Sequence, residues 1–284
     1  MTAFRCLHCG SDAGERTLAG CRDYFTGIDG RFDYFTCQRC GLVQLFPVPA
    51  DLSAFYRNYP VHARKSALHR AMRKLCMSQA YYLRDPDAKE LRVLDFGCGD
   101  GWYLDEMAKR GWKVLGFEFD PQHAAALAEA HRFPVLGNED ELNRSHRGSF
   151  DLVTMHSVIE HLPQLRPYFR SVHEWLRPGG LFYFALPNFD CPERKLFGRK
   201  WHGLDPPRHV SFPHPNLIDR LASETGFAVV QRKVIGLPTA TAGSLSAVLA
   251  GRYSYPLFAA MIPVSLLFCL LFPSNTLCFL LRKS

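Results

Sequence analysis

Four cysteines near the start of the chain have the spacing of metal ligands. Cys6 and Cys9 form one Cys-x-x-Cys pair, and after 27 further residues Cys37 and Cys40 form a second. Thiolates two residues apart can share one tetrahedral ion, and a glycine after each pair lets backbone N–H groups approach the sulfurs. Four thiolates leave no open position on the ion. The pattern therefore predicts a structural zinc site of the ribbon type within residues 1–50.

A glycine-rich turn is the second group with chemical meaning. The apolar run Val93–Phe96 leads into Gly97-Cys98-Gly99-Asp100-Gly101. Such a turn lets a ligand approach the backbone, and the helix start that follows it favours an anionic group. Trp102 stands where a dinucleotide fingerprint has Gly or Ala, which argues against NAD and FAD. Glu118, 21 residues after Gly97, is placed to accept hydrogen bonds from ribose hydroxyls.

The elements that must position these residues alternate between apolar strands and helices. Predicted strands cover residues 92–96, 113–119, 133–136, 151–155, 180–186, 228–234 and 276–281. Predicted helices cover residues 102–110, 121–131, 165–176 and 215–225. The alternation predicts an α/β fold, Rossmann-like and doubly wound, with a mostly parallel seven-stranded sheet and right-handed crossovers.

Residues from about Leu91 to Gly236 resemble the class I S-adenosylmethionine-dependent methyltransferases. Besides the glycine turn, the resemblance rests on the strand that ends at His156, the segment Val158–Pro163, and the turn Leu176–Gly180. It implies that family's fold, methyl transfer, and S-adenosyl-L-methionine as the cofactor.

The resemblance also implies where the cofactor is bound. The expected contacts follow the first three strands or end the fourth: Asp95, Gly97, Cys98, Gly99, Glu118, Phe119, Asn138, Glu139 and His156. In that set Asp95 would order the glycine turn, Glu118 would hold the ribose, and Phe119 would flank the adenine. Asn138 departs from the family pattern, which more often has Asp at this position.

Residues 201–212 resemble a segment of a subgroup that also has a Cys-rich N-terminus and is associated with modification of polysaccharides or sugars. Trp201 would line the mouth of an acceptor pocket or pack on the domain. His161 and His209 are the candidate catalytic bases, since a hydroxyl acceptor needs a group that titrates near neutrality. His202 is a weaker candidate, and each histidine also has a structural interpretation. Some related O-methyltransferases use Glu-x-x-Glu-His around a divalent ion, but Ser157 replaces the first Glu, so no catalytic metal is expected.

Composition leaves the choice of partner open. The 284 residues are 47% hydrophobic and 21% charged, which excludes a disordered or low-complexity chain, and the net charge is +7. We expect a sugar or lipid-linked glycan acceptor. One alternative is an RNA methyltransferase, although residues 1–49 carry five basic and five acidic residues and offer no net charge to phosphates. A second alternative is an inactive cofactor-binding scaffold at a membrane.

The chain divides into three expected parts. A zinc ribbon at 1–50 and a connecting helical segment at 51–90 precede the methyltransferase domain at 91–284, which has an apolar insertion at about 237–275. Within the insertion, Tyr255–Pro273 would be about 28 Å long as a helix, enough to reach across a bilayer core, or it could cover the sheet before a final antiparallel strand. Contact with a membrane surface without a full span is the intermediate interpretation. No apolar signal-peptide run occurs in residues 1–10, so we expect a cytoplasmic protein, peripheral to a membrane or anchored in it by this region.

Overall fold

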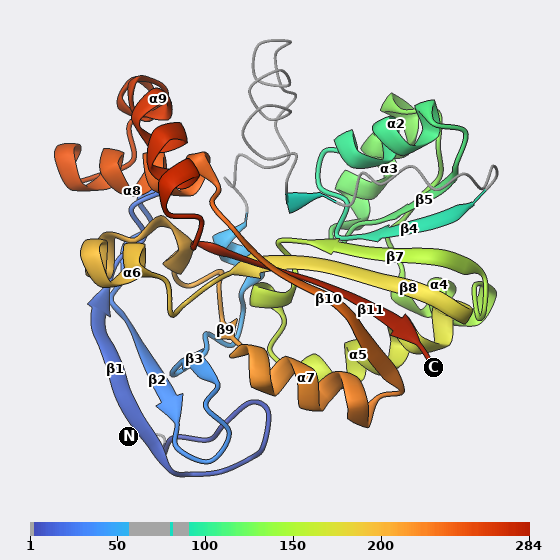
Figure 1. Ribbon diagram of the computed structural model, residues 1–284, viewed down its shortest axis with the longest axis horizontal. Helices are drawn as coiled ribbons and strands as arrows, with labels where there is room; N and C mark the ends of the chain where they lie inside the picture. The colour runs from blue at the N-terminus through green and yellow to red at the C-terminus, as the bar shows by residue number, and fades with distance from the viewer. Residues whose placement is uncertain (1–2, 57–79, 82–90) are drawn as a thin grey trace.

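A computed structural model describes residues 3–56, 80–81 and 91–284 of the chain, and these residues form two sheets (Figure 1). The larger sheet has seven strands in the order β10-β11-β8-β7-β4-β5-β6. Its strands are β4 (Arg92–Phe96), β5 (Lys113–Phe117), β6 (Val135–Leu136), β7 (Phe150–His156), β8 (Leu176–Pro187), β10 (Phe227–Ile235) and β11 (Thr276–Lys283). The predicted Rossmann-like, mostly parallel seven-stranded sheet is confirmed.

Pairing within this sheet follows the prediction. Strand β4 is parallel to β5 and β7, and the outer strands β6 and β8 continue the parallel part. Strand β11 lies between β8 and β10 and is antiparallel to both, as expected for the final strand. Strand β8 begins four residues earlier than predicted, because Leu176 already pairs with Phe150 before an irregularity in the ladder.

Helices cover both faces of the larger sheet. Figure 1 shows α2 (Trp102–Lys109) and α3 (Pro121–Ala130) on one face, with α4 (Glu139–Ser145), α5 (Leu165–Trp175) and α7 (Pro215–Glu224) on the other. Each face has its own buried core, one including Leu104 and Leu127 and the other including Phe169 and Leu221. This is the layered arrangement in which the carboxyl ends of the parallel strands share one edge.

The smaller sheet contains four strands in the order β1-β2-β3-β9. Strands β1 (Gly14–Cys21), β2 (Phe32–Cys37) and β3 (Val43–Leu45) form an antiparallel meander, and a short η1 turn (Ser53–Phe55) follows them. The fourth strand, β9 (Ser211–Phe212), comes from the long connection between β8 and α7. That connection also holds α6 (Pro192–Phe197) and the short turns η5 (Gly198–Lys200) and η6 (His202–Leu204).

The apolar insertion folds into two helices, α8 (Pro238–Ala250) and α9 (Tyr255–Leu271), which pack on each other beside the smaller sheet (Figure 1). Among the residues described, no helix has both the length and the apolar character needed to cross a bilayer. Most of the expected connecting segment at 51–90 lies outside the described residues, so that expectation stays a prediction.

Candidate functional site

The glycine turn lies between β4 and α2 and is held to the neighbouring strand. The amides of Gly97 and Cys98 both donate to the carbonyl oxygen of Phe117, at 2.8 and 2.9 Å. Gly97 has a left-handed φ of 76°, and a Cβ there would lie 2.7 Å from a methyl group of Val158. The close approach leaves no room for a larger residue. The side chain of Cys98 is buried, so only its backbone is available to a ligand.

Glu118 joins the turn to the end of β5. Its Oε2 accepts a hydrogen bond from the Gly99 amide at 3.0 Å, and its Oε1 accepts one from its own neighbour, Phe119, at 2.9 Å. Burial raises the pKa of this carboxyl, and the two amide bonds oppose the rise. Phe119 is 46% exposed next to it. A buried carboxylate and an exposed aromatic ring therefore sit side by side at the carboxyl edge of the sheet.

Asp95 is buried one position before the end of β4 and bonds across to β7. Its Oδ1 accepts from the Thr154 hydroxyl at 2.7 Å and lies 3.1 Å from Nδ1 of His156. In the described part of the chain these bonds fix β7 against β4, whereas the turn itself is held by Phe117 and Glu118. The expected role of Asp95 in ordering the turn stays a prediction.

His156 lies within a cluster of tyrosines that the sequence did not reveal. Its ring centroid is 4.3 Å from that of Tyr81, 4.5 Å from Tyr103 and 5.7 Å from Tyr183. Its Nε2 is buried and has no hydrogen-bond partner among the residues that the structure describes. A buried nitrogen of this kind next to the glycine turn is a place for a polar ligand atom.

Asn138 and Glu139 stand where the third strand of the sheet ends. The Oδ1 of Asn138 accepts from the Asp140 amide at 2.9 Å and so caps the start of α4. Glu139 lines a surface pocket with residues of the segment that begins α5, among them Pro163 and Tyr168. Burial and the charge of Asp140 raise the pKa of Glu139. The expected cofactor contacts lie at the ends of neighbouring strands of the larger sheet. They are the glycine turn, Glu118, Phe119, His156 and Glu139.

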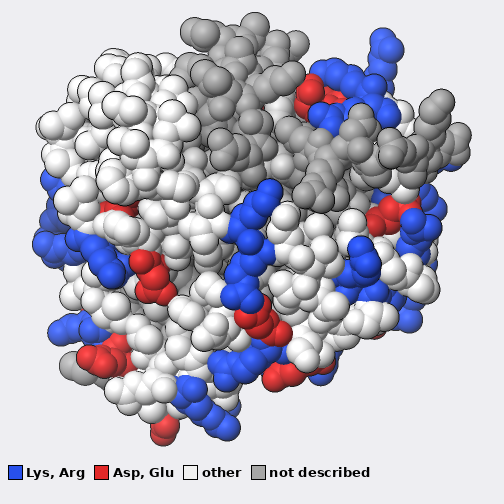
Figure 2. Space-filling model, viewed as in Figure 1, with Lys and Arg blue, Asp and Glu red and all other residues white. Residues whose placement is uncertain are grey.

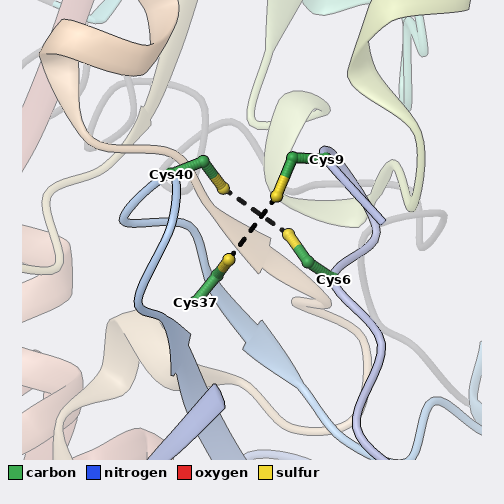
Figure 3. A group of neighbouring side chains, drawn as sticks. All are labelled: Cys6, Cys9, Cys37 and Cys40. Atoms are coloured by element: carbon green, nitrogen blue, oxygen red, sulfur yellow. Dashed lines mark hydrogen bonds between the residues drawn. The ribbon is translucent and has the colours of Figure 1, made fainter. Parts of the chain in front are cut away.

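The four predicted metal ligands come together near the smaller sheet (Figure 3). Sγ of Cys6 is 3.5 Å from Sγ of Cys40, and Sγ of Cys9 is 3.6 Å from Sγ of Cys37. Four thiolates at about 2.3 Å from one tetrahedral zinc ion would be about 3.8 Å apart. All four sulfurs lie within 4.8 Å of one another, and none forms a disulfide. The donor set and its spacing fit a structural zinc ion.

A second cluster unites the two candidate bases. The rings of His161 and His209 meet edge to face with their centroids 4.6 Å apart. Nδ1 of His161 is 2.9 Å from the carbonyl oxygen of Arg208, and Nδ1 of His209 is 2.8 Å from that of Gly203. A carbonyl oxygen only accepts, so each Nδ1 carries the proton and each Nε2 of a neutral ring keeps its lone pair. Tyr56 approaches from the N-terminal part, with its hydroxyl 2.8 Å from Nδ1 of His161.

Carboxylates border this histidine pair. Glu160 is fully buried, and within the described ranges neither of its carboxyl oxygens has a hydrogen-bond partner. Its Oε1 is 3.9 Å from Nε2 of His209. Burial raises the pKa of Glu160 to about 8. Burial together with the neighbouring His161 lowers the pKa of His209 to about 3. Glu160, His161 and His209 each offer one atom within 4.8 Å of the others, a spacing that a divalent ion could bridge, so the expectation of no catalytic metal stays a prediction.

A buried ion-pair network supports the loop that carries His209. The guanidinium of Arg208 pairs with Asp205 on the same loop. It also pairs, at 3.0 Å, with Asp23 in residues 3–49, which we call the N-terminal unit. Burial alone would raise the pKa of Asp205, but the bonds and charge of Arg208 outweigh it and lower the pKa to about 2. Arg208 also donates to the Thr26 hydroxyl at 3.1 Å. The network fixes the loop, and with it the carbonyl oxygens that orient both histidines.

The two other candidates on this loop lie elsewhere. Trp201 is buried in the core shared by the small sheet and the connection, against Phe189 and Phe212, so it packs on the domain. His202 packs against Phe25 and Tyr253, beneath α8. The structure therefore separates His202 from the pair His161 and His209.

A family model described as a methyltransferase domain matches residues 67–232, which is more than half of the chain. The chain belongs to this methyltransferase family. The five strands β4 to β8 of the larger sheet, together with the glycine turn and Glu118, lie in the part that matches, whereas β11 lies beyond it.

Curated relatives of this methyltransferase match over part of their length. The ubiquinone biosynthesis O-methyltransferase of Aromatoleum aromaticum is 32% identical over 153 residues, covering 49% of this chain and 65% of the relative. The enzyme of the same name from Acinetobacter baylyi is 31% identical over 117 residues, covering 37% of this chain and 47% of that enzyme. The chain thus spans about half to two thirds of the length of these relatives.

Solved structures support the fold of the methyltransferase. A Pyrococcus horikoshii protein has a TM-score of 0.54 at 15% identity and covers 81% of this chain and 99% of its own. Phosphoethanolamine N-methyltransferase 2 of Haemonchus contortus, solved with S-adenosyl-L-methionine, has a TM-score of 0.50 at 16% identity, covering 75% of this chain and 52% of that chain. At these identities the likeness concerns the fold alone.

Some residues of the methyltransferase site gave no signal in the sequence. Tyr81 and Tyr103 reach His156 from outside the predicted motifs, and Asp23 reaches the histidine loop from the N-terminal unit.

Proposed function

We propose that the chain transfers a methyl group from S-adenosyl-L-methionine to a hydroxyl of a sugar, either nucleotide-linked or carried on a lipid. The observation that carries the proposal is the contact of Glu118 with the amide of Gly99, at 3.0 Å. It places a buried carboxylate and the glycine turn in one site at the edge where parallel sheets bind ligands. The sulfonium of the cofactor supplies an activated methyl group for in-line displacement.

The residues at this edge fit such a cofactor. Glu118 would accept hydrogen bonds from the ribose hydroxyls, and Phe119 would offer a partly exposed ring to the adenine. The backbone of Gly97 and Gly99 would face the amino acid part, and Nε2 of His156 offers an unpartnered polar atom beside it. Glu139 would meet the base amine at the pocket that it lines.

Removal of the hydroxyl proton is assigned to the histidine pair. His161 is the more exposed of the two rings, so it is the one that an acceptor meets first. His209 lies behind it, and an imidazolium formed in the pair would face the carboxyl groups of Glu160 and Asp205, each 3.9 Å from Nε2 of His209. A neutral ring with a free Nε2 lone pair can accept a proton, and the ionised carboxylate of Asp205 would stabilise the product.

The choice of a hydroxyl acceptor has two supports. The curated relatives are named O-methyltransferases, and the histidine pair supplies the base that transfer to oxygen needs. The sugar is inferred from residues 201–212, which resemble the subgroup associated with polysaccharide and sugar modification. Transfer to RNA is less favoured, since the N-terminal unit has a balanced charge.

We also propose that Cys6, Cys9, Cys37 and Cys40 hold a structural zinc ion. Because all four positions are filled by thiolates, the ion would stabilise the fold and take no part in methyl transfer.

The acceptor is tested by incubating purified protein with methyl-labelled S-adenosylmethionine and a lysate of its source. Label is then measured in lipid, soluble small-molecule, RNA and protein fractions. The proposal expects label in the lipid or sugar-nucleotide fraction, and label in RNA alone would overturn it. Cofactor binding with no label in any fraction would favour the inactive scaffold.

A further inference from the structure

The outer face of α8 and α9 is a continuous apolar surface, which we call the apolar tip. Its exposed side chains belong to Val248, Leu249, Tyr255, Val264, Leu267, Leu270, Leu271 and Phe272. No charged residue occurs from Tyr253 to Leu281. In the view of Figure 2, the region over these two helices shows neither acidic nor basic side chains.

Helix α9 is apolar on both of its faces. The inner face buries Phe258, Ile262 and Cys269, while the outer face exposes Leu267 at 60% and Leu270 at 76%. A helix on the surface of a soluble domain normally has polar residues on its outer face. Contiguous exposed apolar patches mark contact sites, so the apolar tip requires an apolar partner.

The shape of the apolar tip matches a lipid surface. The two helices stand at one corner of the molecule, where β10 ends and β11 begins (Figure 1). Aromatic residues that are half exposed stand at both ends of α9, Tyr255 at 51% and Phe272 at 58%. Aromatic rings favour the boundary between headgroups and acyl chains. An apolar helix that is too short to cross a bilayer can still lie within this boundary layer.

Basic residues surround the turn that joins the two helices. Arg252 is exposed in this turn, and Nζ of Lys200 is 3.5 Å from the carbonyl oxygen of Val248 at the end of α8. Arg22 lines one shallow pocket together with Lys200 and Tyr253. The acid next to Arg22, Asp23, is buried against Arg208 and does not neutralise these charges. In a symmetric contact between two copies the same cations would repel, whereas anionic headgroups would attract them.

We propose that the apolar tip inserts into the interfacial layer of an anionic lipid bilayer. The outer side chains of α8 and α9 would enter the layer, and Arg22, Lys200 and Arg252 would contact the lipid phosphates. This inference goes beyond the proposed methyl transfer, and vesicle binding is measured without any turnover, so failure of one does not decide the other.

The test is co-sedimentation of the full chain with vesicles of phosphatidylcholine, alone or mixed equally with phosphatidylglycerol. We expect binding to the mixed vesicles, and a loss of about tenfold or more in partitioning for L267D/L270D, since two leucines would no longer be buried in lipid. Arg252→Glu should weaken binding to the mixed vesicles and leave any binding to pure phosphatidylcholine unchanged. The matched control is V229D/V230D on edge strand β10, where the same change is made at residues 38% and 46% exposed.

Each outcome decides the matter, provided that circular dichroism shows the variants to be folded. Equal vesicle binding by wild type and L267D/L270D would overturn the proposal, as would wild-type protein that ignores anionic vesicles. A wild-type dimer that L267D/L270D converts to a monomer, with no vesicle binding, would instead assign the apolar tip to contact between copies.

Discussion

The guanidinium of Arg208 pairs with the carboxylate of Asp23, 185 positions earlier in the chain, and both side chains are fully inaccessible to solvent. This pair ties the N-terminal unit to the loop that carries His209. The carbonyl oxygen of Arg208 also orients His161. The N-terminal unit thus takes part in shaping the side of the site that we assign to the acceptor.

Removing the cation of this pair should destabilise the protein strongly. Arg208→Met leaves Asp23 and Asp205 buried without a counter-charge, and we expect a loss of about 3–5 kcal/mol in the free energy of unfolding. Urea denaturation measures it. Arg16→Met is the control, because Arg16 and Asp33 form an exposed pair that should contribute less than about 1 kcal/mol. Equal losses for the two variants would show that the buried network does not support the fold.

Glu160 should make the stability of the protein depend on pH. Its pKa is raised to about 8 from an ordinary value of 4.5, so between these values the folded chain binds more protons than the unfolded one and stability falls as pH rises. Glu160→Gln removes this penalty. The variant should therefore have a higher free energy of unfolding than wild type. This advantage should be on the order of 3 kcal/mol larger at pH 8 than at pH 5.

Denaturation of both proteins at the two pH values measures the difference. Glu129→Gln, on the exposed side of α3, should show no such dependence. If Glu160→Gln and wild type have the same free energy of unfolding at both pH values, ionisation of the Glu160 carboxyl does not destabilise the fold.

The histidine assignment predicts a loss of rate without a loss of cofactor. His161→Asn should slow methyl transfer by about 10²–10⁴-fold and leave the affinity for S-adenosylmethionine unchanged, since a base acts in the transfer step. Label transfer and calorimetry give the two quantities. His214→Asn, at a partly exposed position with an amide that can still cap α7, is the matched control. An unchanged transfer rate in His161→Asn would remove this residue from the mechanism.

The cysteine cluster predicts a metal content. Purified protein should contain one zinc ion per chain, and Cys37→Ser should lose it, because three thiolates and a hydroxyl bind zinc weakly. Elemental analysis measures the ratio. Cys21→Ser, at a buried cysteine outside the cluster, should keep the ion. Full zinc content in Cys37→Ser would contradict a four-cysteine site.

The sequence predicted the larger sheet well because most of its strands are short apolar runs next to a helix. It did not predict α4, whose residues are mostly polar with only Leu142 buried, although Asn138 gives a capping signal. It also missed α8, in which small residues such as Ala242 and Gly243 are buried and leave no apolar stripe. Strand β9 has two residues and exists only through pairing with β3, a contact that no local pattern shows.

In the site, as in the fold, local signals were predicted and long-range contacts were not. The cysteine spacing and the glycine turn are local signals, and their residues come together as expected. The approach of His161 to His209 depends on how the loop at 201–212 folds back, and that in turn depends on Asp23, far away in the chain. Such long-range contacts between buried polar groups leave no periodicity in the sequence.

The central claim is that Glu118 and the glycine turn form the S-adenosylmethionine site, and calorimetric titration tests it most directly. Wild-type protein should bind one equivalent of S-adenosylmethionine, and Glu118→Ala should bind it at least about tenfold more weakly, as expected when hydrogen bonds to a charged group are lost. Glu129→Ala should bind as wild type does. Unchanged affinity in Glu118→Ala would contradict the cofactor assignment.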